Sequence, residues 1–384
     1  MPVITDYRLG ASSRSTHEGD TDLKKSSSGS SRLSYIDLSK GIGIFFVVLV
    51  HALYSSDTGT QQWSAYAQSI LLAFVMPLFF MISGALQGKK LRSKSFCDRL
   101  YLKKLATAIL VPFYTLSFVF AGLNVVFLGR GQGPDVWQML RGILIEQSNP
   151  ALVPSGVLWY LFVLFVLSVT SYVAFKLMRV TGLYVLLCAG ILLHILYPST
   201  FSEINYFAFR RISQYSLFYF LTLALPSLVL NKQLGYRRWL VPTSCTCIVL
   251  AALAAIATFT NNTLANAAHS TVLLLGLYGI FPCLFLLCTA SYLCNVAKGT
   301  LPIRFLIVCG ASSILIYVFH MPTFLVLKKA LPIVMTMPSG IAQIALLLTG
   351  GFLMPLLYGR LLAYMPRLYS VLLGRKPVSN IELR

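Results

Sequence analysis

Long apolar stretches recur along almost the whole chain, and they restrict its fold more than any other feature. Each is long enough to cross about 30 Å of hydrocarbon as a helix. Only 11% of the residues are charged, whereas a soluble domain carries about a quarter. The pattern therefore predicts an all-α polytopic integral membrane protein of about ten helices. The approximate spans are 38–57, 66–87, 106–128, 155–175, 181–198, 212–230, 239–260, 270–294, 305–327 and 339–360.

The basic residues are divided unequally between the two sides of these spans. Of the 31 Lys and Arg residues, 25 fall in the N-terminal region and on every second loop, and 6 fall on the other side. Cytoplasmic loops carry an excess of Lys and Arg, so both termini are predicted to be cytoplasmic. Topology thus explains the net charge of +20. The lipid bilayer is the predicted partner, and no nucleic acid is expected.

Composition divides the chain into three parts. Residues 1–33 are rich in Ser and charge and predict a disordered cytoplasmic tail. Residues 34–365 form the transmembrane domain, and 366–384 form a cytoplasmic C-terminal tail. The longest external loop, 129–154, has apolar residues at helical spacing and predicts a short amphipathic helix at the outer interface. This helix is either a lid over a site or a plain interfacial helix.

The first span carries two groups that suit chemistry at a membrane. Lys40 and His51 are eleven residues apart, which places them within about 20° of one helix face, with His51 about 16 Å deeper. A neutral histidine accepts a proton at physiological pH, and a surface lysine binds phosphate. Ionisable residues inside a membrane are usually functional. The alternative is a His51 that bonds a neighbouring helix beside an ordinary flanking lysine.

Four segments, in chain order, resemble the membrane-bound acyltransferase-3 family. Lys40, ten intervening residues and His51 are similar to its Arg/Lys-x10-His signature. Its nearest branch in pattern is fucose 4-O-acetylase-like and includes exopolysaccharide O-acetyltransferases. The other three segments are Pro77-Leu78-Phe79-Phe80-Met81-Ile82-Ser83-Gly84, Leu158-Trp159-Tyr160-Leu161 and Ser312-Ser313-Ile314-Leu315-Ile316-Tyr317-Val318-Phe319-His320.

The resemblance implies an O-acetyltransferase. Such an enzyme moves an acetyl group from acetyl-CoA to a sugar hydroxyl of an exopolysaccharide or lipopolysaccharide precursor. The acceptor is then a polysaccharide or a lipid-linked sugar. The family also implies a multi-pass protein of the bacterial inner (plasma) membrane. Acetyl-CoA is a co-substrate, and neither a bound cofactor nor a metal is expected.

The resemblance also suggests roles for individual residues. His51 would be the general base, with Lys40 and the neighbouring Asp37 beside it in the catalytic set. The donor-binding residues would be Lys40, Ser83, Gly84, Arg99, Lys103 and Lys104. The acceptor-binding residues would be His320, Arg210, Arg211, Trp159 and Tyr160.

Alternatives stay open for several of these residues. The family's Arg-x-x-Arg pattern is absent from the basic stretch 99–104, so its role is unassigned among Arg99, Lys103 and Lys104. Ser83 and Gly84 equally suit close helix packing. For the acceptor set, the alternatives are a structural His320, arginines that bind lipid headgroups, and interfacial anchoring by Trp159 and Tyr160.

The competing function class is a transporter or flippase of a lipid-linked or small polar solute. Such proteins often use carboxylates inside the membrane for ion coupling. All 11 acidic residues fall in predicted loops, tails or helix ends. This distribution disfavours carboxylate-coupled transport. A scaffold without activity would be favoured if Lys40 and His51 proved dispensable.

Overall fold

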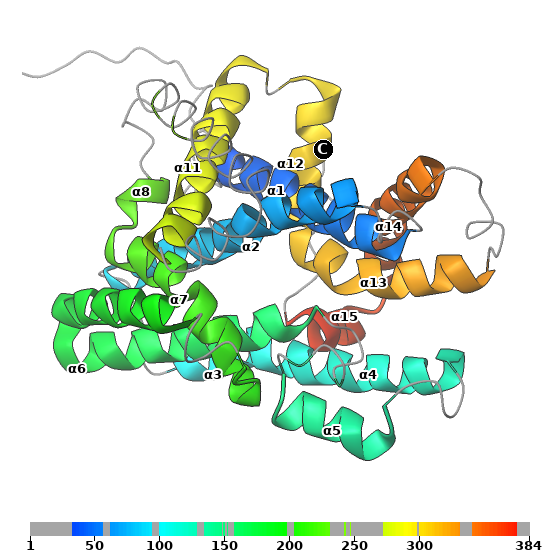
Figure 1. The fold of residues 1–384 in the computed structure, drawn as a ribbon, viewed down its shortest axis with the longest axis horizontal. Helices are drawn as coiled ribbons and strands as arrows, with labels where there is room; N and C mark the ends of the chain where they lie inside the picture. Colours follow the sequence, from blue (N-terminus) through cyan, green and yellow to red (C-terminus); the bar gives the residue numbers. More distant parts are fainter. Residues whose placement is uncertain are drawn as a thin grey trace, which may run out of the picture. The chain divides into compact units, whose positions relative to one another are not determined.

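The structure is a computed structural model, and every element that it describes is a helix (Figure 1). The described residues are 33–56, 62–93, 100–128, 134–147, 149, 152, 157–197, 203–230, 242, 246, 272–297, 299–330 and 340–374. The α-helices are α1 (Ser34–Ser55), α2 (Gln62–Leu91), α3 (Tyr101–Leu105), α4 (Val111–Leu128), α5 (Val136–Leu144), α6 (Trp159–Leu196), α7 (Phe209–Ala224), α8 (Ser227–Leu230), α11 (Val272–Val296), α12 (Leu301–Ala311), α13 (Ser313–Ala330), α14 (Gly340–Ala363) and α15 (Pro366–Leu373). A π-helical turn (Ala106–Leu110) joins α3 to α4, and a 3-10 turn (Tyr206–Ala208) precedes α7.

Seven helical segments within these ranges are long and apolar enough to cross a membrane. They are Ser34–Ser55, Trp63–Leu91, Tyr101–Leu123, Trp159–Leu196, Gly279–Val296, Ser313–Ala330 and Gly340–Ala363. The helical membrane fold predicted from the sequence is confirmed for the described residues. The total of about ten spans and the cytoplasmic side of the termini stay predictions. The predicted span 239–260 and the tail up to residue 32 lie outside the description of the structure, apart from the isolated positions 242 and 246.

Helix α6 is two helices joined by a sharp turn. Its 38 residues would extend about 57 Å, nearly twice the hydrocarbon thickness. Arg179 breaks the helix with a φ of 55° and a ψ of −135°. A methyl group at Gly182 would collide with the carbonyl oxygen of Ala174, although these residues would lie about 12 Å apart in a straight helix. The chain therefore folds back at Arg179, which confirms the predicted break between 155–175 and 181–198.

The segment predicted as one span at 305–327 is interrupted at Ser312, where α12 ends and α13 begins. Mean hydropathy over a span-length window averages over this break, although Gly310, Ala311, Ser312 and Ser313 at it are small or polar. The helix expected within 129–154 is present as α5. Asp135 caps it, and Gln138 completes a reciprocal capping box. α15 forms the first part of the predicted C-terminal tail, and its Tyr369 and Leu373 are buried against Leu315 of α13.

Helix α1 is surrounded by other helices and packs against α2, α11, α12, α13 and α14. Its closest neighbour is α12, because two glycines lie where the helices cross. A methyl group on Gly41 would overlap the carbonyl oxygen of Leu306, and one on Gly310 would overlap that of Asp37. Small residues at such crossings let helix backbones approach in membranes. This contact fixes the part of α1 that carries Lys40.

Helices α2 and α7 pack almost as closely. Thr222 of α7 donates a hydrogen bond to the carbonyl of Met81 at 2.7 Å. Arg92, just beyond α2, donates to the carbonyls of Leu223 at 2.8 Å and Ala224 at 2.9 Å. Burial lowers the pKa of this guanidinium. Arg92 thereby satisfies carbonyls at the end of α7, which have no partner within their own helix.

Candidate functional site

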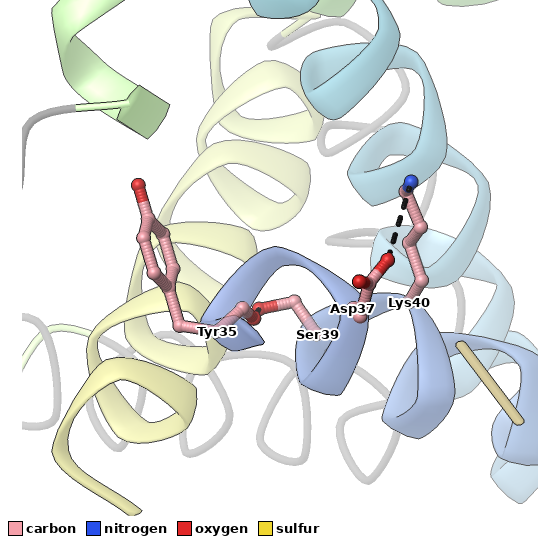
Figure 2. Close-up of polar contacts among 4 residues, drawn as sticks. All are labelled: Tyr35, Asp37, Ser39 and Lys40. Carbon is pink, nitrogen blue, oxygen red and sulfur yellow. Dashed lines mark hydrogen bonds and ion pairs between the residues drawn. The ribbon is translucent and has the colours of Figure 1, made fainter. Parts of the chain in front are cut away.

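Helix α1 carries both Lys40 and His51, as predicted, and places them about three turns apart. At the first end, the Lys40 Nζ lies 3.9 Å from the Oδ1 of Asp37. Figure 2 shows the Asp37 and Lys40 side chains next to each other, with the Tyr35 ring nearer the start of α1. The Tyr35 hydroxyl donates to the carbonyl of Val229 at 3.0 Å, and Ser39 donates back to the Tyr35 carbonyl at 2.8 Å. These contacts hold in place the part of α1 from which the Lys40 side chain projects.

At the other end of α1, His51 meets the second predicted histidine. The ring centroids of His51 and His320 are 5.1 Å apart, and the planes are inclined by 46°. His320 is fully buried in α13, whereas His51 is partly exposed. Two residues that lie far apart in the sequence thus form one pair of imidazoles. His51 is the more exposed member of the pair.

The hydrogen bond of His320 defines its protonation. Its Nδ1 lies 3.1 Å from the carbonyl oxygen of Ile316. A carbonyl only accepts hydrogen bonds, so in the neutral ring Nδ1 carries the proton and Nε2 holds a lone pair. The Nε2 atom is buried and has no hydrogen-bond partner among the described residues. An unsatisfied buried acceptor costs about 1–3 kcal/mol, which a hydroxyl donor on a substrate would remove.

Aromatic rings extend from the histidine pair toward α6 and α2. The ring of Tyr317 lies 6.3 Å from that of His320 and 5.6 Å from that of Tyr160. The Tyr160 hydroxyl then shares a hydrogen bond of 3.2 Å with Ser83 of α2. The Tyr317 hydroxyl donates to the carbonyl of Val157. One row of side chains therefore joins residues from three of the four segments identified in the sequence.

Trp159 begins a second aromatic group beside this row. Its ring stacks on that of Tyr215 of α7, with the centroids 5.4 Å apart, and the Arg211 guanidinium lies over the Trp159 ring, 4.8 Å from its centroid. The Arg211 Nη1 also donates to Gln214 at 3.0 Å. Arg211 is close enough to Tyr317 to interact with it electrostatically. A cation and a stack of rings thus border the histidine site.

The remaining predicted residues lie at various distances from this cluster. Gly84 lies against the carbonyl of Tyr219 in α7, as the helix-packing interpretation expects. Arg210 is partly buried near the start of α7, and its backbone amide donates to Ile204 at 2.9 Å. Lys103 and Lys104 are exposed on α3. Arg99 lies outside the described residues.

Sequence reasoning did not select Tyr317 or Tyr215, although both belong to the cluster. Tyr317 lies three residues before His320 in a segment that the sequence analysis quoted. Tyr215 follows Arg211 by four residues, so both lie on one face of α7. A helical-face analysis of the residues around each predicted site would have found both.

The comparison with protein families adds independent evidence. The sequence matches the family described as "Acyltransferase domain" over residues 33–360. The chain belongs to the acyltransferase-3 family. No curated protein and no solved structure matches it. The histidine pair, the aromatic row and the Lys40 end of α1 all lie within the matched region, so the protein is a membrane acyltransferase and the cluster is its candidate active site.

Proposed function

We propose that this acyltransferase is an O-acetyltransferase. It would move the acetyl group of acetyl-CoA to a sugar hydroxyl of an exopolysaccharide or lipopolysaccharide precursor in a bacterial inner membrane. The observation that carries the proposal is the pairing of His51 with His320. It supplies one partly exposed imidazole and one buried acceptor with no partner among the described residues, bordered by hydroxyls and aromatic rings. A polyhydroxylated acceptor suits these groups because it offers several O–H donors at once.

In the proposed reaction, His51 is the general base. It takes the proton of the acceptor hydroxyl while the oxygen forms a bond to the thioester carbonyl carbon. The carbon–sulfur bond then breaks, and the proton on His51 passes to the departing CoA thiolate. Proton transfer by a positioned side chain of this kind contributes about 10²–10⁴-fold to the rate.

His320 would hold the acceptor rather than take its proton. Its Nε2 lone pair accepts a hydrogen bond from a second acceptor hydroxyl, and its Nδ1 stays bonded to Ile316. Trp159 and Tyr160 would form the wall along which the sugar lies. Arg211, joined by Arg210, would contact an anionic substituent of the acceptor, because Arg211 forms no ion pair with an acid in the described part of the chain.

The donor would approach from the Lys40 end of α1. The cations Lys40, Arg99, Lys103 and Lys104 would bind the phosphates of CoA, since charged donors form the strongest bonds to phosphate. Asp37 would hold Lys40 in place. The pantetheine arm would then run along α1 and past Ser83, which brings the thioester to His51. Ser83 remains bonded to Tyr160 in this arrangement.

The test measures O-acetyl groups on surface polysaccharide from cells that carry the wild type, His51→Ala or no copy. His194→Ala is the matched control. His194 is also a buried histidine in a membrane helix, and its Nδ1 is bonded to the carbonyl of Gln214 at 3.1 Å. The protein level in membranes is measured for each variant. We expect the acetyl groups to be lost without the gene and with His51→Ala, and to be retained with His194→Ala.

Two results would contradict the proposal at different points. Full acetylation with His51→Ala would exclude His51 as the base. Normal acetylation without the gene would exclude this acceptor class. A labelled acetyl-CoA assay on membranes would then identify the molecule that receives the acetyl group.

A further inference from the structure

A hollow lies between α12 and α14, and the proposed reaction does not use it. It encloses about 540 Å³. Its lining consists of Leu301, Arg304, Phe305, Val308, Leu353, Leu356, Leu357 and Arg360. These residues recur every three or four positions on each helix, so each helix presents one face to the groove. We call this hollow the α12–α14 groove.

The groove combines apolar walls with two cations. Six of its eight lining residues are apolar, two are arginines and none is acidic. Several apolar members are strongly exposed on the protein, including Leu301 at 80%, Leu353 at 56% and Leu357 at 48%. Side chains of this kind next to a membrane helix are solvated by lipid chains rather than by water. The occupant of the groove must therefore be amphiphilic.

The two arginines of the groove indicate that the polar end of its occupant is negatively charged. Arg304 lies in the first turn of α12, just after the N-cap Thr300, where the helix dipole is positive and disfavours a cation. Arg360 lies in the last turn of α14. No carboxylate lies in the lining of the groove, so an anionic group that enters it would meet two guanidinium groups and no competing acid. Guanidinium groups bind phosphate through paired hydrogen bonds.

We propose that the α12–α14 groove binds an anionic phospholipid. The headgroup phosphate binds Arg304 and Arg360, and an acyl chain lies along Phe305, Val308 and Leu353. α12 also crosses α1 at the glycine contact below Lys40. A lipid in the groove would therefore stabilise the helix that holds α1 in place. This inference is independent of the proposed acetyl transfer.

The experiment uses the full-length protein purified in a neutral detergent. Binding of dioleoyl phosphatidylglycerol and of dioleoyl phosphatidylcholine is titrated by native mass spectrometry. The variants are Arg304→Gln, Arg360→Gln and the double variant. Arg367→Gln is the matched control, because Arg367 is an exposed arginine on α15 outside the groove. The double substitution to lysine, R304K/R360K, changes both side chains but keeps both charges. It therefore controls for a disturbance of the groove that is unrelated to charge.

We expect the wild type to bind phosphatidylglycerol at least tenfold more tightly than phosphatidylcholine. An arginine near an anionic lipid contributes about 1 kcal/mol, so each Gln substitution should weaken phosphatidylglycerol binding about fivefold, and both together about 25-fold. The lysine double variant should keep most of the preference, and Arg367→Gln should keep all of it.

Three results would overturn the proposal. One is equal affinity for the two lipids in the wild type. Another is unchanged phosphatidylglycerol binding in a double Gln variant that is monodisperse and present at normal levels. The last is a double Gln variant with an unchanged lipid preference and a raised KM for acetyl-CoA. This result would assign the groove to acetyl-CoA instead of a lipid.

Discussion

The imidazole of His320 has one nitrogen bonded to the carbonyl of Ile316 and another with no hydrogen-bond partner in the described part of the chain. The substitution His320→Asn separates these two functions, because the shorter amide still donates at the position of Nδ1 but has nothing at the position of Nε2. We expect kcat/KM for the acceptor to fall about tenfold to a hundredfold, the loss of one hydrogen bond to a buried acceptor. The KM for acetyl-CoA should not change.

His194→Asn is the control for that prediction, since its Nδ1 is bonded to a carbonyl in the same manner. Near-normal activity with His194→Asn and a specific loss with His320→Asn would assign the effect to Nε2. Equal losses in both variants, or a loss of protein from the membrane, would instead make His320 a structural residue.

Arg211 offers a second test at this scale, because it lies over the Trp159 ring. Arg211→Lys keeps the charge but loses the planar group that stacks, and Arg211→Gln loses both. A cation and an aromatic ring interact by about 0.5–2 kcal/mol. If Arg211 recognises an anionic acceptor, acceptor KM should rise slightly with lysine and severalfold more with glutamine. Equal KM values for the two variants would contradict charge recognition.

The sequence identified most members of this site separately but not their arrangement. Lys40 and His51 could be related to each other because both lie on one helix of known periodicity. His320, Trp159 and Arg211 could not be placed against them, because contacts between helices depend on side-chain packing that one sequence does not specify. Tyr317 lies one turn before His320 and could have been selected by helical spacing, but its contact with Tyr160 depends on how α13 packs against α6.

At the scale of elements, the crossing of α1 and α12 depends on two glycines. Gly41→Ala would place a methyl group against the carbonyl of Leu306, and overpacking of this kind costs about 1–3 kcal/mol. We expect the free energy of unfolding in detergent to fall by that amount, measured by thermal unfolding of the purified protein. Activity should fall with it, since the displaced part of α1 carries Lys40.

Gly122→Ala is the matched control for this crossing, because nothing lies within 4 Å of the added methyl group. In the helix interior this change should be neutral or stabilise α4 by up to about 1 kcal/mol. If Gly41→Ala unfolds at the same temperature as Gly122→Ala, the close crossing of α1 and α12 is wrong.

Hydropathy predicted the helices more accurately than their ends. The helical spacing of the apolar residues within 129–154 predicted α5, and the gap between the predicted spans 155–175 and 181–198 predicted the turn in α6. The break at Ser312 was missed, although the small or polar residues Gly310, Ala311, Ser312 and Ser313 lie across it and Gly310 packs against the backbone of α1 there. The span 305–327 was predicted from length and mean hydropathy, which average over so short an interruption.

For the whole molecule, the number of membrane spans determines whether the two termini lie on the same side of the membrane. The seven candidate segments become eight when α6 is counted as two helices, and α7 lies within a ninth predicted span. Two termini on one side require an even number of crossings. The predicted span 239–260, which falls outside the description of the structure except at 242 and 246, supplies the tenth.

Alkaline phosphatase fusions test this span directly, because the enzyme is active only on the outer side of the bacterial inner membrane. We expect a fusion after Arg237 to be inactive and a fusion after Asn262 to be active, since 239–260 separates them. A fusion to the full-length C-terminus should be inactive, in agreement with the excess of Lys and Arg on the inner loops. Equal activity after Arg237 and Asn262 would mean that 239–260 does not cross. The count would then be odd, the termini would lie on opposite sides, and the positive-inside assignment of the three later spans, α11, α13 and α14, would have to be reversed.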